Sequence, residues 1–148
     1  MNGYDAVVDI LKKEGFEWIA CFPANPLIEA AGKGGLKPIV FRQERGGIMA
    51  ADGYARMMAK EGKMGVFCSQ GGPGIENSFG GFAQAWAEAV PVLYLPAGSP
   101  ANVAEVKPAF DPQTNFAHIT KWCSSITKSS EISTQMRRAM SALKNGRP

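Results

Sequence analysis

Short apolar segments alternate with helix-like segments along this chain, and that order restricts its fold more than any other feature. The apolar segments have the length of buried strands and lie at 16–22, 38–41, 63–69 and 90–95. Segments with helical periodicity follow each other at 2–14, 27–31, 44–60, 77–88 and 129–143. Strands separated by helices pair in parallel, because the crossover helix returns the chain to the same edge. We therefore expect an α/β fold with a doubly wound, mostly parallel sheet and helices on both faces.

Two segments near the C-terminus depart from this regular alternation. Residues 96–113 hold four of the ten prolines, which favours a long loop or lid. Residues 119–126 are apolar enough to predict an additional edge strand before the last helix. The expected sheet therefore has five strands, the fifth at its edge.

Composition excludes several classes of protein. A length of 148 residues is typical of one domain, and a net charge of +3 spread along the chain gives no basic stripe for nucleic acid. No stretch is apolar for long enough to cross a membrane. The three cysteines are odd in number and have no C-x-x-C spacing, which favours a reduced, cytoplasmic protein.

Three loops are expected to meet at the carboxyl edge of the sheet, where ligands bind in parallel α/β folds. They are FPANP at 22–26, RQER at 42–45 and QGGPG at 70–74. The last of these is neither G-x-G-x-x-G nor a P-loop, because no GK[ST] follows. On the local pattern alone, its glycines either cradle a ligand or only permit the close approach of backbone to a neighbour.

Glu44 lies in the first turn of the helix expected at 44–60, and two interpretations are open. A carboxylate there complements the helix dipole and can pair with Arg42 or Arg45 at the surface. The small residues Ala50, Ala51, Gly53 and Ala55 instead predict that one face of the helix packs closely on another helix. Such packing would bury the start of the helix and make Glu44 more than a cap.

Two long motifs resemble one known family. RQERGGIMAADGYAR at 42–56 is similar to the R-H-E-x-x-A-x-x-M-A-D-G-Y-A-R stretch of thiamine-diphosphate-dependent enzymes of the acetolactate synthase type. GGPGIENSFGGFAQAWAEAVPVLYLPAG at 71–98 resembles the S-G-P-G-A-T-N segment of the same family. ITKW at 119–122 and the terminal LKNGRP also keep the order of the family motifs. The resemblance runs along essentially the whole chain.

The resemblance implies that residues 1–148 are an N-terminal pyrimidine-binding domain of the thiamine-diphosphate-binding fold and a fragment of a longer chain. Glu44 matches the glutamate that hydrogen-bonds a ring nitrogen of the cofactor's aminopyrimidine and relays a proton there. Pro73, Gly74 and Asn77 match the segment that lines the pyrimidine pocket. Glu44 is thus both a catalytic and a cofactor-binding candidate.

Other positions match the family less well. Gln70 stands where relatives carry a histidine or a small hydroxyl residue, and it is a catalytic candidate on the substrate side. Asn25 and Pro26 occupy the place of a G-x-P-G loop near the reactive carbon and are cofactor-binding candidates. The histidine that precedes the glutamate in the family is Gln43 here, so the resemblance supports no imidazole beside the cofactor.

The resemblance implies an enzyme that is incomplete as this chain alone. No metal ligand of the family lies in these residues, so Mg²⁺ and the cofactor's diphosphate are expected on a domain of another subunit, in a homodimer or homotetramer. The expected reaction decarboxylates or carboligates a 2-keto acid, and a requirement for FAD stays open. The alternatives are the small subunit of a split sulfopyruvate or phosphonopyruvate decarboxylase, and a non-catalytic module that kept the fold.

Overall fold

Four parallel strands form the centre of the molecule. The computed structural model describes residues 2–22, 26–100, 102–103, 106 and 110–147. The strands, each bounded as given, are β1 Trp18–Cys21, β2 Lys37–Val40, β3 Gly65–Ser69 and β4 Val92–Pro96. Their order across the sheet is β2-β1-β3-β4, and every pairing is parallel. The expected α/β class is confirmed.

Five of the six helices among the described residues overlap the expected helical segments, and the short helix Pro112–Phe116 was not predicted. The helices are α1 Gly3–Lys13, α2 Pro26–Lys33, α3 Glu44–Met57, α4 Pro73–Ala87, α5 Pro112–Phe116 and α6 Ile132–Lys144, with 3-10 turns at Ala59–Glu61 and Ser129–Glu131. Helix α1 starts where its sequence directs, because Asn2 and Asp5 form a reciprocal capping box. Helix α4 starts earlier than expected: Pro73 takes its first position after Gly72, which has φ 59°.

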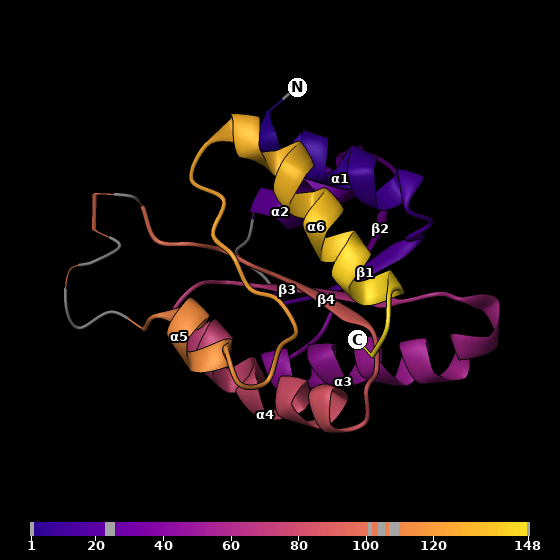
Figure 1. Cartoon of the computed structure of the whole chain (residues 1–148). Helices are drawn as coiled ribbons and strands as arrows, with labels where there is room; N and C mark the ends of the chain where they lie inside the picture. The colour runs from indigo at the N-terminus through magenta and orange to yellow at the C-terminus, as the bar shows by residue number, and fades with distance from the viewer. Residues whose placement is uncertain (1, 23–25, 101, 104–105, 107–109, 148) are drawn as a thin grey trace.

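Helices cover both faces of the sheet (Figure 1), as expected for a doubly wound fold. Helices α1, α2 and α6 pack on one face, and α3 and α4 pack on the other. Successive strand residues alternate between the two cores: Val66 and Cys68 face the first group, whereas Phe67 faces the second. Cys21 and Cys68 are register partners on β1 and β3, so two free cysteines distant in sequence are neighbours in the core.

Helices α3 and α4 approach closely through a glycine. A Cβ added to Gly81 of α4 would lie 2.4 Å from Cγ2 of Ile48 on α3. Ala51 and Ala55 are fully buried, as their small size suggested. Gly53 was expected on the same tight face, but a Cβ there would meet nothing within 4 Å among the described residues, so that part of the prediction is wrong.

The predicted edge strand at 119–126 is wrong. The described residues of that segment form no strand, and β4 remains the edge of the sheet. The apolar side chains of the segment serve two different cores, because Ile119 packs with the α3 and α4 side and Trp122 with the α1, α2 and α6 side. The segment thus runs past the edge of the sheet from α5 on one face to α6 on the other (Figure 1).

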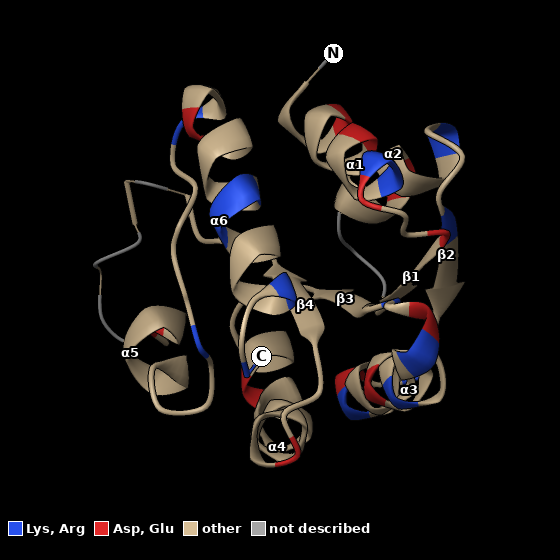
Figure 2. Ribbon diagram, turned by 45° about the vertical axis from the view of Figure 1, so that its right-hand side comes forward, with Lys and Arg blue, Asp and Glu red and all other residues tan. Residues whose placement is uncertain are grey.

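Charged residues are interspersed over the helices (Figure 2), with Lys and Arg near Asp and Glu on α1 and α3. This distribution agrees with the small net charge of +3. None of the helices in the described part of the chain combines the length and the apolar character needed to span a membrane.

Candidate functional site

Glu44 is a buried carboxylate at the carboxyl edge of the sheet. It follows β2 and is the first residue of α3, after Gln43, whose side chain makes no capping hydrogen bond. Its relative exposure is 3%. Neither Arg42 nor Arg45 pairs with it, and no ion pair to Glu44 occurs among the described residues. The interpretation of Glu44 as a surface ion-pair partner is therefore wrong.

The first turns of α4 surround this carboxylate. Nδ2 of Asn77 donates a hydrogen bond to Oε2 of Glu44 at 3.3 Å. A Cβ added to Gly74 would lie 3.0 Å from Oε1 of Glu44 and 2.8 Å from Cγ of Gln70. Only glycine therefore leaves both side chains where they are. The structure thus brings together four of the residues that the sequence singled out, from the loops after β2 and β3.

The remaining candidates from the sequence are Pro73, Pro26 and Asn25, and the two prolines are not part of this buried group. Pro73 is exposed at the start of α4, where a proline costs no hydrogen bond because the first helical N–H has no partner in the helix. Pro26 is exposed at the start of α2, on the opposite face of the sheet from α3 and α4. Asn25 lies outside the described residues, as does most of the first of the three expected loops.

A buried cluster of hydroxyl groups lies behind Gly74, and sequence reasoning did not find it. Oγ of Ser69, at the end of β3, lies 2.6 Å from the hydroxyl of Tyr94 on β4. Oγ of Ser78 on α4 lies 2.8 Å from the same hydroxyl. Ser69 and Ser78 are fully buried. The only sequence signal for this cluster is a tyrosine in the otherwise apolar strand VLYLP.

The ring of Tyr94 is fixed by other aromatic rings. It stacks on Phe82 of α4, with ring centroids 4.5 Å apart, and on Phe67 of β3, with centroids 5.4 Å apart. Phe116 of α5 closes the cluster, with its ring centroid 5.9 Å from that of Tyr94. The hydroxyl of Tyr94 therefore has little freedom to leave its two serine partners.

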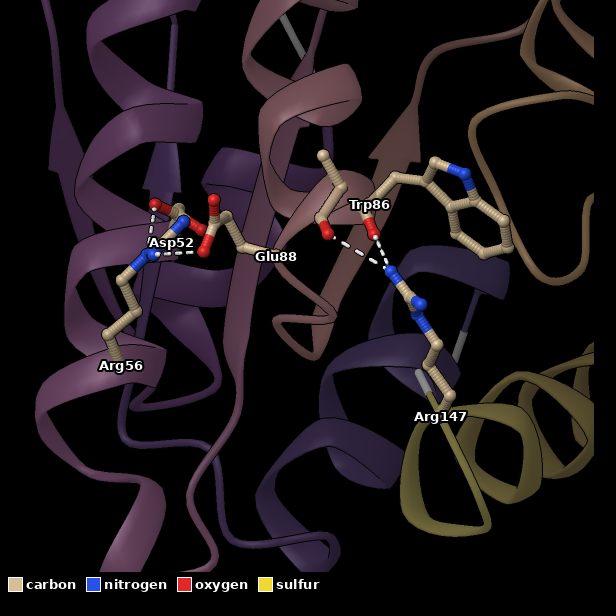
Figure 3. Close-up of polar contacts among 6 residues, drawn as sticks. Asp52, Arg56, Trp86, Glu88 and Arg147 are labelled. Carbon is tan, nitrogen blue, oxygen red and sulfur yellow. Dashed lines mark hydrogen bonds and ion pairs between the residues drawn. The ribbon is translucent and has the colours of Figure 1, made fainter.

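Two arginines hold the C-terminal end of α4, opposite the site (Figure 3). Arg56 of α3 contacts Oδ2 of Asp52 at 2.9 Å and Oε2 of Glu88 at 3.7 Å, which joins α3 to the residue after α4. Nη2 of Arg147 donates to the carbonyl oxygens of the last two residues of α4, at 3.3 and 3.0 Å. Arg147 thus caps the carbonyl end of α4, where a cation is favourable, and Arg56 joins α3 to the same end through Glu88.

The unfolding free energy is expected to depend on Tyr94 at alkaline pH. The pKa of Tyr94 is raised to about 12, chiefly by burial and also by the negative charge of Glu44. The hydrogen bonds with Ser69 and Ser78 act in the opposite direction. The unfolded chain releases this proton near pH 10, so the stability is fully present below pH 10 and is lost as pH rises toward 12. A difference of two pH units corresponds to about 2 to 3 kcal/mol at most.

Urea unfolding between pH 8 and pH 12 measures this dependence. Tyr94→Phe has no proton to release, so the difference in unfolding free energy between wild type and Tyr94→Phe should shrink across this window. A difference that stays constant with pH would show that Tyr94 does not hold its proton in the folded state. Tyr4→Phe, which changes an exposed tyrosine on α1, is the control.

The described residues offer no metal site. Among them, no three or more His, Cys, Asp and Glu side chains are grouped so that they could hold a metal ion. The carboxylate at the site, Glu44, has an amide and a glycine as neighbours, Asn77 and Gly74. This set suits a neutral, polar ring that offers hydrogen-bond donors and acceptors, rather than a cation or a phosphate.

Comparisons with known proteins agree with the resemblance. The model of the family described as "Thiamine pyrophosphate enzyme, N-terminal TPP binding domain" matches residues 1–124. The chain is 33% identical over 153 residues to the probable acetolactate synthase large subunit of Methanocaldococcus jannaschii, covering 100% of this chain and 25% of that protein. It is 36% identical over 98 residues to the acetolactate synthase isozyme 2 large subunit of Escherichia coli K12, covering 64% of this chain and 17% of that protein.

A third relative, the acetolactate synthase large subunit of Haemophilus influenzae, is 25% identical over 154 residues, which cover 100% of this chain and 26% of that protein. The chain thus spans about a quarter of the length of the curated relatives that it matches from end to end. Both the matched family model and the parallel α/β sheet agree with one assignment. This chain belongs to the thiamine pyrophosphate enzyme family, as a member of its N-terminal TPP-binding domain.

Proposed function

We propose that this chain is the pyrimidine-binding domain of a thiamine-diphosphate-dependent enzyme of the acetolactate synthase type, which decarboxylates or carboligates a 2-keto acid. One observation carries the proposal: Glu44 is a buried carboxylate without an ion-pair partner among the described residues. Burying such a group is costly unless a ligand or a hydrogen bond compensates. The amide of Asn77 supplies one hydrogen bond, and a ligand would supply the other.

The residues at the site fit the aminopyrimidine ring of thiamine diphosphate. Glu44 would hold a proton between its carboxylate and a ring nitrogen, and Asn77 would fix the orientation of that carboxylate. Gly74, which has no side chain, would let the ring lie against the backbone. When bound, the cofactor supplies the electron sink that decarboxylation of a 2-keto acid requires.

The roles of the other candidates are also part of the proposal. Gln70 begins the loop after β3, its Cγ lies beside Gly74, and its amide would contact the substrate side of the site. Pro73 would line the ring pocket through its exposed position at the start of α4. Asn25 and Pro26 would approach the cofactor near its reactive carbon, from the loop after β1.

The rest of the site is proposed to come from other parts of the assembly. A diphosphate-binding domain of another subunit would hold the diphosphate and Mg²⁺, in a homodimer or homotetramer. The chain covers only 25% and 26% of the two relatives that it matches from end to end, which supports the proposal that this domain acts within a longer protein. The three free cysteines support a reduced, cytoplasmic location. A requirement for FAD depends on residues outside this domain.

An activity assay of the complete assembly tests the proposal. We expect pyruvate consumption that requires added thiamine diphosphate and Mg²⁺, and we expect the isolated 148 residues to bind the cofactor too weakly to detect by calorimetry. Activity on sulfopyruvate or phosphonopyruvate, but not on pyruvate, would instead favour the small subunit of a split decarboxylase. No cofactor dependence with any of the three 2-keto acids would leave a non-catalytic module.

A further inference from the structure

We propose that Tyr94 is a positioning residue whose hydroxyl keeps the Asn77 amide on the Glu44 carboxylate. Tyr94 lies on β4, the strand beside β3, and its hydroxyl reaches the site only through other groups. Two hydrogen-bonded routes connect it to the site. One runs through Ser78 on α4, and the other runs through Ser69 at the end of β3.

The first route fixes the helical turn that carries Asn77. Ser78 follows Asn77 directly, and its Oγ lies 2.8 Å from the Tyr94 hydroxyl and 2.8 Å from the carbonyl oxygen of Ile75. Ser78 is fully buried, so no water replaces these contacts. The hydroxyl of Tyr94 thus anchors to β4 the second turn of α4, which carries Asn77.

The second route borders Gly74 on its other side. Oγ of Ser69 lies 2.6 Å from the Tyr94 hydroxyl and 3.0 Å from the carbonyl oxygen of Gln70, where the chain leaves β3. A Cβ added to Gly74 would lie 3.5 Å from Oγ of Ser69 and 3.0 Å from Oε1 of Glu44. Ser69 and Glu44 therefore confine the same glycine from two directions.

The two oxygens of the Glu44 carboxylate have different neighbours, which fixes the orientation of the group. Asn77 contacts Oε2 of Glu44, while Oε1 faces Gly74. If α4 turned or shifted at its start, both contacts would change together. The stacked rings of Phe67 and Phe82 keep the ring of Tyr94 in place, so its hydroxyl is a fixed reference point for both routes.

Nuclear magnetic resonance of this chain tests the inference without any cofactor. Tyr94→Phe keeps the aromatic stack and removes the hydroxyl. We expect the side-chain amide signals of Asn77 to broaden and the chemical shift of the Glu44 carboxyl carbon at neutral pH to change, relative to wild type. Tyr54→Phe removes a phenolic hydroxyl from α3 where the ring packs on Trp18 of β1 rather than at the site, so we expect it to leave both signals as in wild type.

A purely structural role would give a different result. In that case Tyr94→Phe would lower the unfolding free energy and leave the Asn77 and Glu44 signals unchanged, and this result would overturn the inference. If Tyr94→Phe proves too unstable for spectra, Ser78→Ala removes the first route while it keeps the Tyr94 ring. We expect the same broadening of Asn77 in Ser78→Ala, and unchanged Asn77 signals would also overturn the inference.

The catalytic consequence rests on the proposed function and is measured in the complete enzyme. Hydrogen-bond partners that orient the ligands of metal sites contribute about 10- to 100-fold, and we take the same range for a group that orients a carboxylate. We expect Tyr94→Phe to lower kcat within that range and to leave the KM for the 2-keto acid unchanged. If the wild-type enzyme is active and Tyr94→Phe leaves kcat unchanged, the role of Tyr94 is contradicted and the proposed function stands. If the wild-type enzyme shows no cofactor dependence, the proposed function is contradicted, and the spectra alone decide the role of Tyr94.

Discussion

Glu44→Gln is expected to lower the turnover of the complete enzyme by roughly 10²- to 10⁴-fold, the range that a positioned proton-transfer group contributes. Glutamine has nearly the same shape as glutamate, so it can occupy the space between Asn77 and Gly74. Its amide cannot hold and return a proton, however. The loss should therefore appear in kcat, with cofactor still bound at saturating concentration, and steady-state kinetics on pyruvate measures it.

The fold is expected to survive the same substitution. Glu44 makes no ion pair among the described residues, so its removal costs mainly its favourable position at the start of α3, which is worth about 0.3 to 1 kcal/mol. Loss of a buried charge partly offsets that cost. Urea unfolding of the variant domain should thus give a midpoint close to that of wild type.

Glu76→Gln is the matched control for Glu44→Gln. Glu76 lies in the first turn of α4, beside Asn77, but its side chain is exposed. The chemical change is the same, and the expected change in turnover is small. Wild-type turnover in Glu44→Gln would show that Glu44 only caps the helix. Equal losses in both variants would show that the charge of the region matters, rather than the buried carboxylate.

The alternation of short apolar and helical segments was enough to predict the fold class. Each strand and helix needed only local periodicity, and the parallel pairing followed from the length of the crossovers. The error at 119–126 arose because Ile119 and Trp122 pack against different cores, as residues three apart in an edge strand would also do, so the apolar pattern alone does not distinguish a strand from an irregular segment. Helix α5 has five residues, too few for a periodic signal, and it is held by the packing of Phe116 on Phe79 and Phe82.

The site was predictable as far as it depends on which loops meet. Parallel strands bring the loops after β2 and β3 to one edge, which places Glu44 near Gln70, Gly74 and Asn77. The supporting groups were not predictable in the same way. Ser69, Ser78 and Tyr94 come from three elements, and each has an ordinary structural role until their hydroxyl groups are seen to meet.

One missed feature does have a sequence signal. The α4 residues Gly74, Ser78, Gly81 and Ala85 are small, buried and spaced by four, three and four, which is the spacing of one helix face. Two of its members lie against α3: Gly74 beside Glu44 and Gly81 beside Ile48. The glycines after Asn77 are therefore not equivalent: Gly81 belongs to this face, whereas Gly80 does not.

Gly81→Ala is expected to destabilise the domain by about 1 to 3 kcal/mol or more, the usual cost of forcing an additional methyl group into a packed core. The new Cβ would lie 2.4 Å from Cγ2 and 3.0 Å from Cγ1 of Ile48, which is itself fully buried. Ile48 is β-branched and stiff, so the helices must separate rather than the side chain rotate. The midpoint of urea unfolding measures this loss.

The neighbouring glycine supplies the control, because Gly80→Ala adds the same methyl group where nothing lies within 4 Å among the described residues. Alanine favours a helix over glycine by about 1 kcal/mol, so Gly80→Ala should leave the unfolding free energy unchanged or raise it. The double variant Gly81→Ala with Ile48→Ala lacks Cγ1 and Cγ2 of Ile48, the two atoms nearest the new methyl group. Its loss of unfolding free energy should therefore be smaller than the sum of the losses in the two single variants. Additive losses would mean that the two side chains do not meet.

Gly81→Ala should also affect the site, because α3 carries Glu44 and α4 carries Asn77. The same separation of the helices should weaken the contact between these two residues. Gly81→Ala should therefore lose catalytic turnover at temperatures where it is still folded.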